Sequence, residues 1–278
     1  MNPSMITAAA TMGQLQKKID TIGHNLANLN TYGYKAREVR FSSLLFQQVD
    51  NLPREDEEEA RLTPDGIRLG YGAGIGETNV NMARGTLQQT GRALDVALLD
   101  AYQFFQIEPA GDGGPAVTYT RDGAFYLQPD AGNPDLLNLV TKDGDFVLGA
   151  GGRIQIPADY ETIAINGRGE IEVTLGDGRH LQAGRLSLAR ILRPQLLHSM
   201  GDNQFAFPEL DALNLQEADV VQPVAVNEAS VSQGALESSN VDLVTQMTQL
   251  MNTQRAYQFN ARAVTLSDQT MRAINNIR

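Results

Sequence analysis

Residues 5–26, MITAAATMGQLQKKIDTIGHNL, carry apolar side chains at steps of three and four without a break. The positions are Met5, Ala8, Met12, Leu15, Ile19, Ile22 and Leu26. A strict seven-residue repeat puts a narrow apolar seam on one side of a helix, which is the geometry of a coiled coil. We therefore predict a helix from about Pro3 to Asn28, with Asn2 as its N-cap and proline at its first position.

The other end of the chain repeats this pattern. Leu243, Met247, Leu250, Tyr257, Ala261, Val264 and Met271 keep the same register, interrupted only by Gln254 and Asp268. The predicted helix starts after Ser239 or Asn240, either of which can cap it, and runs to Ile277. Such stripes usually mean an ordinary bundle core. Two matching seams separated by a long β-region instead favour packing against each other, as a coiled coil, or against other copies of the chain. The predicted subunit-interface residues are Met5, Met12, Leu15, Ile19, Ile22, Leu26, Leu243, Met247, Leu250, Tyr257, Val264 and Met271.

The middle of the chain has the pattern of β-structure. Asp122-Gly123, Asp143-Gly144, Asn166-Gly167 and Asp177-Gly178 are each flanked by strand-like sequence, which predicts four hairpins with two-residue turns. The predicted fold class is α+β, mainly β with long terminal helices around a central antiparallel β-domain. The expected segments are an N-terminal helix (1–35), a linker (36–75), the β-domain (76–230) and a C-terminal helix (231–278). The linker holds a short amphipathic stretch, Phe41 to Val49, and an acidic insert, Pro53 to Glu59.

Composition narrows the range of partners. The 278 residues carry a net charge of −11, and the excess of acidic residues lies in the middle of the chain, so nucleic acid is not an expected partner. No apolar run approaches the roughly 18 residues that span a bilayer, so no direct membrane insertion is expected. The first residues lack a basic cluster followed by an apolar core, which argues against a cleaved signal peptide. Cysteine is absent.

No motif in the sequence predicts chemistry. The glycines of residues 70–76 lack the spacing and the following helix of a dinucleotide fingerprint, and there is no Walker lysine. His24, His180 and His198 lie far apart in sequence, and a zinc site without cysteine would need two of them with a carboxylate. We therefore expect no catalytic, cofactor-binding or metal-binding residues and no enzymatic activity.

Four blocks of the sequence resemble bacterial flagellar rod and hook proteins. The first block, His24 to Lys35 (HNLANLNTYGYK), resembles the N-terminal signature of that family. Gly85 to Leu98 resembles the block that opens the family's β-domain, and Tyr119 to Phe125 is similar to its characteristic hairpin. The fourth block, Gln233 to Val244 and on through Ala261, is similar to the C-terminal signature. The blocks occur in the family's order at both ends and in the centre.

The resemblance implies a subunit of the flagellar hook–basal body, closest to the distal rod protein. It implies that the terminal helices form a coiled-coil inner tube and the β-domain an outer layer of a helical homopolymer. The implied partners are other rod and hook proteins and the flagellar type III export apparatus, and the implied location is the basal body outside the cytoplasmic membrane. Phe41-Ser42-Ser43-Leu44-Leu45 resembles the export-gate motif, in which Phe41 and Leu45 are the key positions.

One departure from the family pattern is visible. Asp100-Ala101-Tyr102-Gln103 replaces the usual glycine-rich turn before Phe104-Phe105. Two alternatives stay open at this point. The chain could be a proximal rod or hook subunit of the same family, or a secreted enzyme or wall-binding module on a helical stalk.

Overall fold

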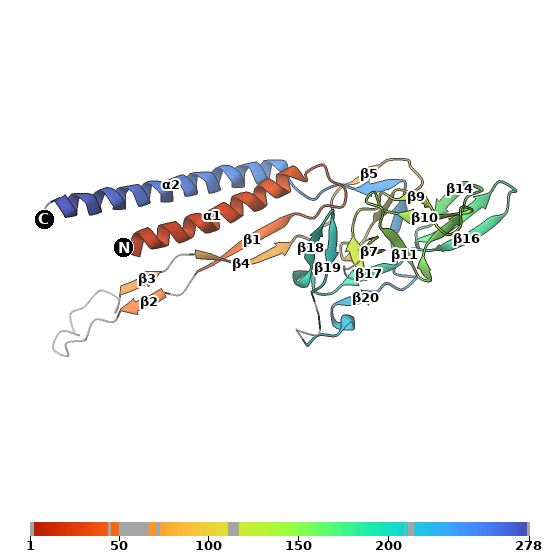
Figure 1. Cartoon of the computed structure of the whole chain (residues 1–278), viewed down its shortest axis with the longest axis horizontal. Helices are drawn as coiled ribbons and strands as arrows, with labels where there is room; N and C mark the ends of the chain where they lie inside the picture. The colour runs from red at the N-terminus through yellow and green to blue at the C-terminus, as the bar shows by residue number, and fades with distance from the viewer. Residues whose placement is uncertain are drawn as a thin grey trace. The chain divides into compact units, whose positions relative to one another are not determined.

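The computed structural model describes residues 3–43, 46–49, 67–70, 73–110, 117–208, 210 and 214–276. They form two long helices and a series of antiparallel strands (Figure 1), which confirms the predicted mainly-β fold with a helix near each end. The chain divides into two compact units. We call residues 1–26, 37–79 and 243–278 the helix–ribbon unit, and residues 27–36 and 80–242 the β-body.

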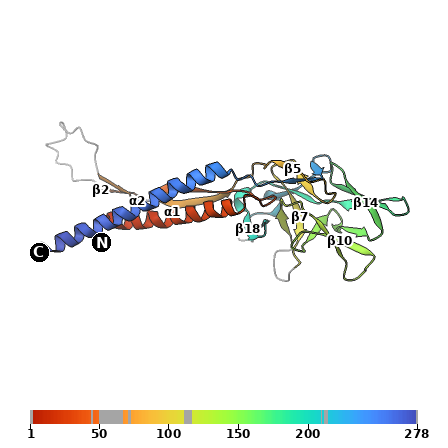
Figure 2. The same ribbon diagram turned by 90° about the horizontal axis from the view of Figure 1, so that it is seen from above.

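The helix–ribbon unit contains both long helices. Helix α1 spans Pro3–Ala27 and α2 spans Leu243–Asn276. Both views show them side by side and running in opposite directions (Figures 1 and 2), and Asn25 Nδ2 donates a hydrogen bond of 3.3 Å to Gln246 Oε1 between them. The predicted short amphipathic stretch is not helical, because β1 (Arg37–Ser43) and β2 (Phe46–Val49) run through it. Strand β1 pairs with β4 (Ala73–Val80), and β2 pairs with β3 (Ile67–Gly70).

The predicted seam differs between the two helices. In α1, Ile22 is buried, and Met5, Met12, Leu15, Ile19 and Leu26 are half-buried. In α2, Leu250, Tyr257 and Val264 are half-buried. Leu243, Met247 and Met271 remain 40–44% exposed. The coiled-coil pairing of the two seams therefore stays a prediction.

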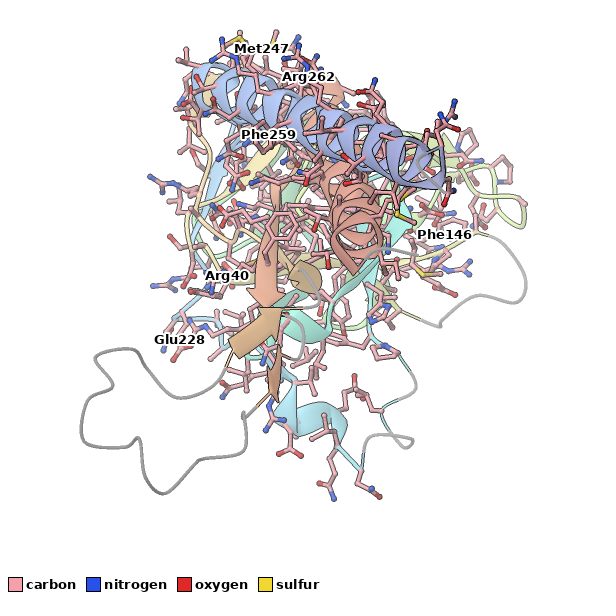
Figure 3. All side chains as sticks on the ribbon, turned by 90° about the vertical axis from the view of Figure 1, so that its left-hand side faces the viewer. Arg40, Phe146, Glu228, Met247, Phe259 and Arg262 are labelled. Carbon is pink, nitrogen blue, oxygen red and sulfur yellow. The ribbon has the colours of Figure 1, made fainter. Side chains whose placement is uncertain are left out.

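A second apolar row on α2 lies outside the predicted seam. Its members recur every seven or eight residues and are each more than half exposed, namely Val244, Met251, Phe259, Leu266 and Ile274. The side chains of Met247, Phe259 and Arg262 project from α2 in Figure 3. In the described part of the chain, no helix is both long and apolar enough to cross a membrane.

Antiparallel sheets make up the β-body. Its strands are β5 (Leu87–Gln89), β6 (Val96–Leu98), β7 (Gln103–Glu108), β8 (Thr118–Thr120), β9 (Tyr126–Pro129), β10 (Leu136–Val140), β11 (Phe146–Gly149), β12 (Gly152–Arg153), β13 (Gln155–Pro157), β14 (Tyr160–Ile165), β15 (Glu170–Leu175), β16 (His180–Arg185), β17 (Leu188–Ile191), β18 (His198–Gly201), β19 (Gln204–Ala206), β20 (Val221–Pro223), β21 (Val231–Gln233) and β22 (Ala235–Glu237). In the part of the β-body that the structure describes, the short 3-10 helices Pro194–Leu196 and Glu217–Asp219 lie between strands.

Among the described residues, the largest sheet has 11 strands, with the path β13-β10-β11-β7-β8-β19-β18. Strands β14, β15 and β16 form a separate three-stranded sheet. Segments distant in sequence close the body, because β21 pairs with β6 and β22 with β5. The C-terminal signature block thus adds strands to the block that begins at Gly85.

Adjacent phenylalanines on β7 serve two different cores. Successive side chains of a strand point to opposite faces, so Phe105 packs edge-to-face on Phe125 with ring centroids 5.0 Å apart, while Phe104 meets Phe205 at 5.9 Å. Phe105 belongs to a large cluster that includes Leu98, and Phe104 to a second cluster with Phe205. All four phenylalanines are buried, so this pair joins both apolar cores through one strand.

Three of the four predicted hairpins are present, but the prediction of two-residue turns was wrong for them: each turn is longer, and its positive φ lies at a single glycine, Gly144, Gly169 or Gly178. Asp143-Gly144 joins β10 to β11, Asn166-Gly167 joins β14 to β15, and Asp177-Gly178 joins β15 to β16. The fourth prediction was wrong: Asp122-Gly123 follows β8, which pairs with β7 and β19, while β9 pairs with β10. A two-residue turn occurs instead at Asp202-Asn203 between β18 and β19, where both residues have positive φ, 46° and 60°.

The predicted cap of the C-terminal helix was also wrong. Helix α2 begins at Leu243, so neither Ser239 nor Asn240 stands at its N-cap position. The side-chain oxygen of Asn240 accepts the Ala36 N–H at 2.7 Å, and its amide group donates to the carbonyls of Asn81 and Ala83 at 2.9 Å. These long-range contacts within the β-body override the local capping preference.

Candidate functional site

Glu237 is the centre of a buried ionic site in the β-body. Strand β22 ends at this residue, and its side chain is 1% exposed. Its Oε1 accepts hydrogen bonds of 2.8 Å from Lys35 Nζ and from the Gly85 N–H, and its Oε2 accepts from Arg121 Nε and Nη2 at 2.9 and 2.5 Å. We call Lys35, Arg121 and Glu237 the ionic junction. Each member comes from a different resembling block, and Gly85 begins the remaining one.

Arg121 holds the junction to the adjoining turn. Its Nη1 donates to the carbonyl oxygens of Asp100 and Gln103 at 2.6 and 2.5 Å, and its guanidinium lies 5.5 Å from the Phe104 ring centroid. The carbonyls come from the turn in which this chain departs from the family pattern. Asp100 shapes that turn by accepting the Tyr102 N–H at 2.9 Å. The departure therefore still presents backbone oxygens to a buried cation.

Lys35 is a buried cation with two acceptors, the Glu237 carboxylate and the Ala83 carbonyl at 2.9 Å. Burial lowers the pKa of Lys35 from 10.5 to about 8, and repulsion from Arg121 adds to this effect, while Glu237 opposes it. Burial alone would raise the pKa of Glu237, but the charges of Arg121 and Lys35 outweigh it and hold that pKa below its ordinary value. One carboxylate thus compensates two cations.

Two glycines allow the segments to approach this closely. Gly33 has φ of +68°, and a Cβ there would collide with the backbone of Arg121. A Cβ on Gly85 would collide with the carbonyl of Ser238. Any other residue type at either position would push apart the segments that the junction joins.

Asn25, from the N-terminal block, makes a separate contact within the helix–ribbon unit. Its side chain accepts the Arg37 N–H and donates to the Arg37 carbonyl, both at 2.9 Å. Asn25 is buried. It thereby satisfies both backbone groups of the first residue of β1, as a neighbouring strand would.

The residues that the sequence predicted as sites lie outside the ionic junction. All the predicted subunit-interface residues are on α1 and α2. Of the predicted export motif, Phe41 is 39% exposed on β1 with Lys18 Nζ 5.3 Å from its ring centroid. Leu45 and the acidic insert lie outside the described residues. In the described part, no group of three or more His, Asp or Glu side chains could hold a metal ion.

The ionic junction could be found in the sequence only as part of the resembling blocks. Lys35 and Glu237 are 202 positions apart, and neither stands in a local pattern that predicts a buried charge. The charged groups of the junction bind one another and thereby hold distant segments of the chain together. We therefore infer that this fold and site belong to a protein with a structural role.

Comparisons with known proteins identify the family. Three family models match the chain: the flagella basal body rod protein (5–35), the D1 domain of the flagellar hook protein FlgE/F/G (99–173), and the C-terminal region of the flagellar basal body rod FlgEFG proteins (232–277). The flagellar hook-basal body complex protein FlhP of Bacillus subtilis is 41% identical over 99% of both chains. The flagellar basal-body rod protein FlgG of the same species is 30% identical over 99% of this chain and 98% of the relative. FlgG of Agrobacterium fabrum is 32% identical over 96% and 95%.

The chain therefore belongs to the family of flagellar hook–basal body rod proteins. The family models for the two ends cover α1 and the start of the β-body on one side, and β22 and α2 on the other. They include Lys35 and Glu237, so the junction lies where the matched regions meet in the structure.

Proposed function

We propose that this chain is a structural subunit of the bacterial flagellar basal body that polymerises helically into the rod and transmits torque. The observation that carries the proposal is the 41% identity to FlhP over nearly the whole of both chains. Contacts that do not close into a ring generate a helical tube from a single kind of subunit. The partners would be further copies of the chain, other rod and hook proteins, and the flagellar type III export apparatus.

The exposed side of α2 supports the polymer. Phe259 is 73% exposed and Val244 72%, and both belong to the second apolar row. A monomer gains nothing from presenting such a row to water, whereas a helical assembly would cover it. We propose that this row and the predicted seams of α1 and α2 both form contacts between subunits, including the coiled coil of the inner tube. The assembled protein would lie outside the cytoplasmic membrane, reached without a cleaved signal peptide.

Enzymatic activity is not part of the proposal. Glu237 is the buried carboxylate with the most charged partners in the described part of the chain. Its oxygens are occupied by Lys35, Arg121 and the Gly85 N–H. A carboxylate held in this way lacks the free oxygen that a general acid or base requires.

The position of the subunit within the rod has two candidates. The family resemblance favours a distal rod subunit. The comparison with two proteins of one bacterium favours a role like that of FlhP, because this chain is 41% identical to FlhP and 30% identical to FlgG of Bacillus subtilis.

Complementation separates the two candidates. The chain is expressed in a Bacillus subtilis strain that lacks FlhP and in one that lacks FlgG, and swimming is measured in soft agar. Restored swimming only in the strain without FlhP supports the FlhP-like role, and restoration only in the strain without FlgG supports the distal rod.

The presence of this chain in the hook–basal body is tested independently, by mass spectrometry of hook–basal bodies purified from the source bacterium. Absence of this chain from them would contradict the proposal.

A further inference from the structure

Residues 27–36 lie against the β-body as a short segment that we call the strap. Gly33, Tyr34, Lys35 and Ala36 are all buried. The strap belongs to the β-body by its contacts, although in sequence it directly follows most of α1. Its burial therefore depends on partners that come from elsewhere in the chain.

Residues 237–240 make three hydrogen bonds to the strap, and further hydrogen bonds come from Asn81 and Ala83. The Gly33 N–H donates to the Glu237 carbonyl at 2.8 Å, and Lys35 Nζ donates to the Glu237 carboxylate at 2.8 Å. The Ala36 N–H donates to the side chain of Asn240 at 2.7 Å. Asn203, at the turn between β18 and β19, adds a hydrogen bond of 2.8 Å to the Tyr32 carbonyl.

The charges of the junction make the strap depend on residues 237–240 more than those residues depend on the strap. Without the strap, Glu237 still holds Arg121 through two hydrogen bonds and accepts the Gly85 N–H, so the remaining pair is electrically balanced. Without residues 237–240, a docked strap would place Lys35 beside Arg121 with no carboxylate between them. Two buried cations without a counter-ion are strongly unfavourable.

We propose that the strap docks only on a β-body whose C-terminal segment, residues 233–242, is already in place. The strap then becomes ordered only after residues 233–242. A chain whose C-terminal segment is missing or displaced cannot order the strap, so the ionic junction makes the ordering of one end of the protein conditional on the other end.

Hydrogen–deuterium exchange of the full chain tests this order with three glycine variants. Exchange is followed by mass spectrometry in the strap, in residues 233–240, and in β15 as an internal reference. Gly33→Ala should raise exchange in the strap at least tenfold and leave the other two segments unchanged. Gly85→Ala should raise exchange in both the strap and residues 233–240 and leave β15 unchanged. Gly151→Ala, where an added Cβ meets nothing within 4 Å, is the matched control.

Two outcomes would overturn the proposal. One is a Gly33→Ala protein in which residues 233–240 lose protection together with the strap. The other is a Gly85→Ala protein in which residues 233–240 exchange freely while the strap stays protected.

A charge variant tests the same order if Gly85→Ala does not fold. Glu237→Gln should release the strap, because docking would bury Lys35 beside Arg121 without a carboxylate. Adding Lys35→Met removes that second cation, so the double variant should exchange its strap at least tenfold more slowly than Glu237→Gln alone. Equal exchange in the single and double variants would also overturn the proposal.

Discussion

Burial makes the positive charge of Lys35 unfavourable in the folded β-body, so the contribution of Lys35 to stability depends on pH. Its pKa is about 8 in the folded chain and 10.5 ordinarily, so the unfolded chain binds more protons between these values. Where the unfolded state binds more protons, the free energy of unfolding rises with pH. The charged groups that act on Lys35 are Glu237, Arg121 and Arg84.

Substitution of Lys35 by methionine should remove this dependence. We expect the free energy of unfolding of the natural chain, measured relative to that of Lys35→Met, to increase from about pH 7.5 to about pH 9.5. Urea denaturation of both proteins at the two pH values measures it. If the difference in free energy of unfolding between the two proteins stayed constant, or fell as the pH rose, the charged form of Lys35 would not be destabilised by burial and by Arg121.

A second prediction at the scale of one residue concerns the hydrogen bonds between Asn25 and the backbone of Arg37. Asn25→Ala leaves the N–H and the carbonyl of Arg37 without their side-chain partner, and an unsatisfied buried group costs about 1–3 kcal/mol. We expect the amide of Arg37 to exchange at least tenfold faster in this variant. Asn30→Ala changes an exposed asparagine of the same block and serves as the control. Equal protection of Arg37 in both variants would contradict the role assigned to Asn25.

At the scale of elements, local periodicity predicted the two helices well. The seven-residue repeat extends over residues 5–26, and α1 spans Pro3–Ala27. The repeat predicts a helix because helical spacing depends only on residues that are close in sequence. It missed the row of Val244, Phe259 and Ile274, whose spacing of seven to eight residues drifts around the helix and fits no strict heptad.

Turns and long-range contacts were predicted less well. Asp-Gly and Asn-Gly identified three hairpins, but Asp202-Asn203 went unnoticed because residues other than glycine seldom take positive φ. Asn240 looked like a helix cap in sequence, yet it binds Ala36, Asn81 and Ala83. The ionic junction could not be predicted, since no local pattern pairs Lys35 with a carboxylate 202 residues away. The family resemblance marked the right blocks without showing that they meet.

The helices supply a prediction about assembly. Leu250 is half-buried on α2, and a carboxylate there would have to be desolvated wherever that side of the helix is covered. We expect Leu250→Asp to block assembly of the rod and to leave the β-body folded, and we expect the same of Leu15→Asp. Gln249→Asp puts the same charge on a neighbouring exposed position and should assemble normally.

Electron microscopy of basal bodies and a thermal melt of the purified protein together measure this effect. Normal rods in either leucine variant would contradict the role of the seams. If Gln249→Asp also failed to assemble, the loss of assembly could not be assigned to the seam, because a negative charge outside the seam would have the same effect.

At the scale of the whole molecule, the two units have different physical characters. The β-body holds large apolar clusters and a charge-balanced hydrogen-bond network, so it can be stable within a single chain. The helix–ribbon unit leaves much of α2 exposed, and among the described residues of α2 only Thr253 is buried. In the proposed polymer, neighbouring subunits would cover the exposed side of α2.

The most direct test of the structural role is electron microscopy of basal bodies from a strain that lacks this chain, together with its swimming. We expect truncated rods without hooks and no swimming, with both restored when the chain is supplied again. Complete rods with hooks and unimpaired swimming in the deletion strain would contradict the proposal that this chain is a structural subunit of the rod.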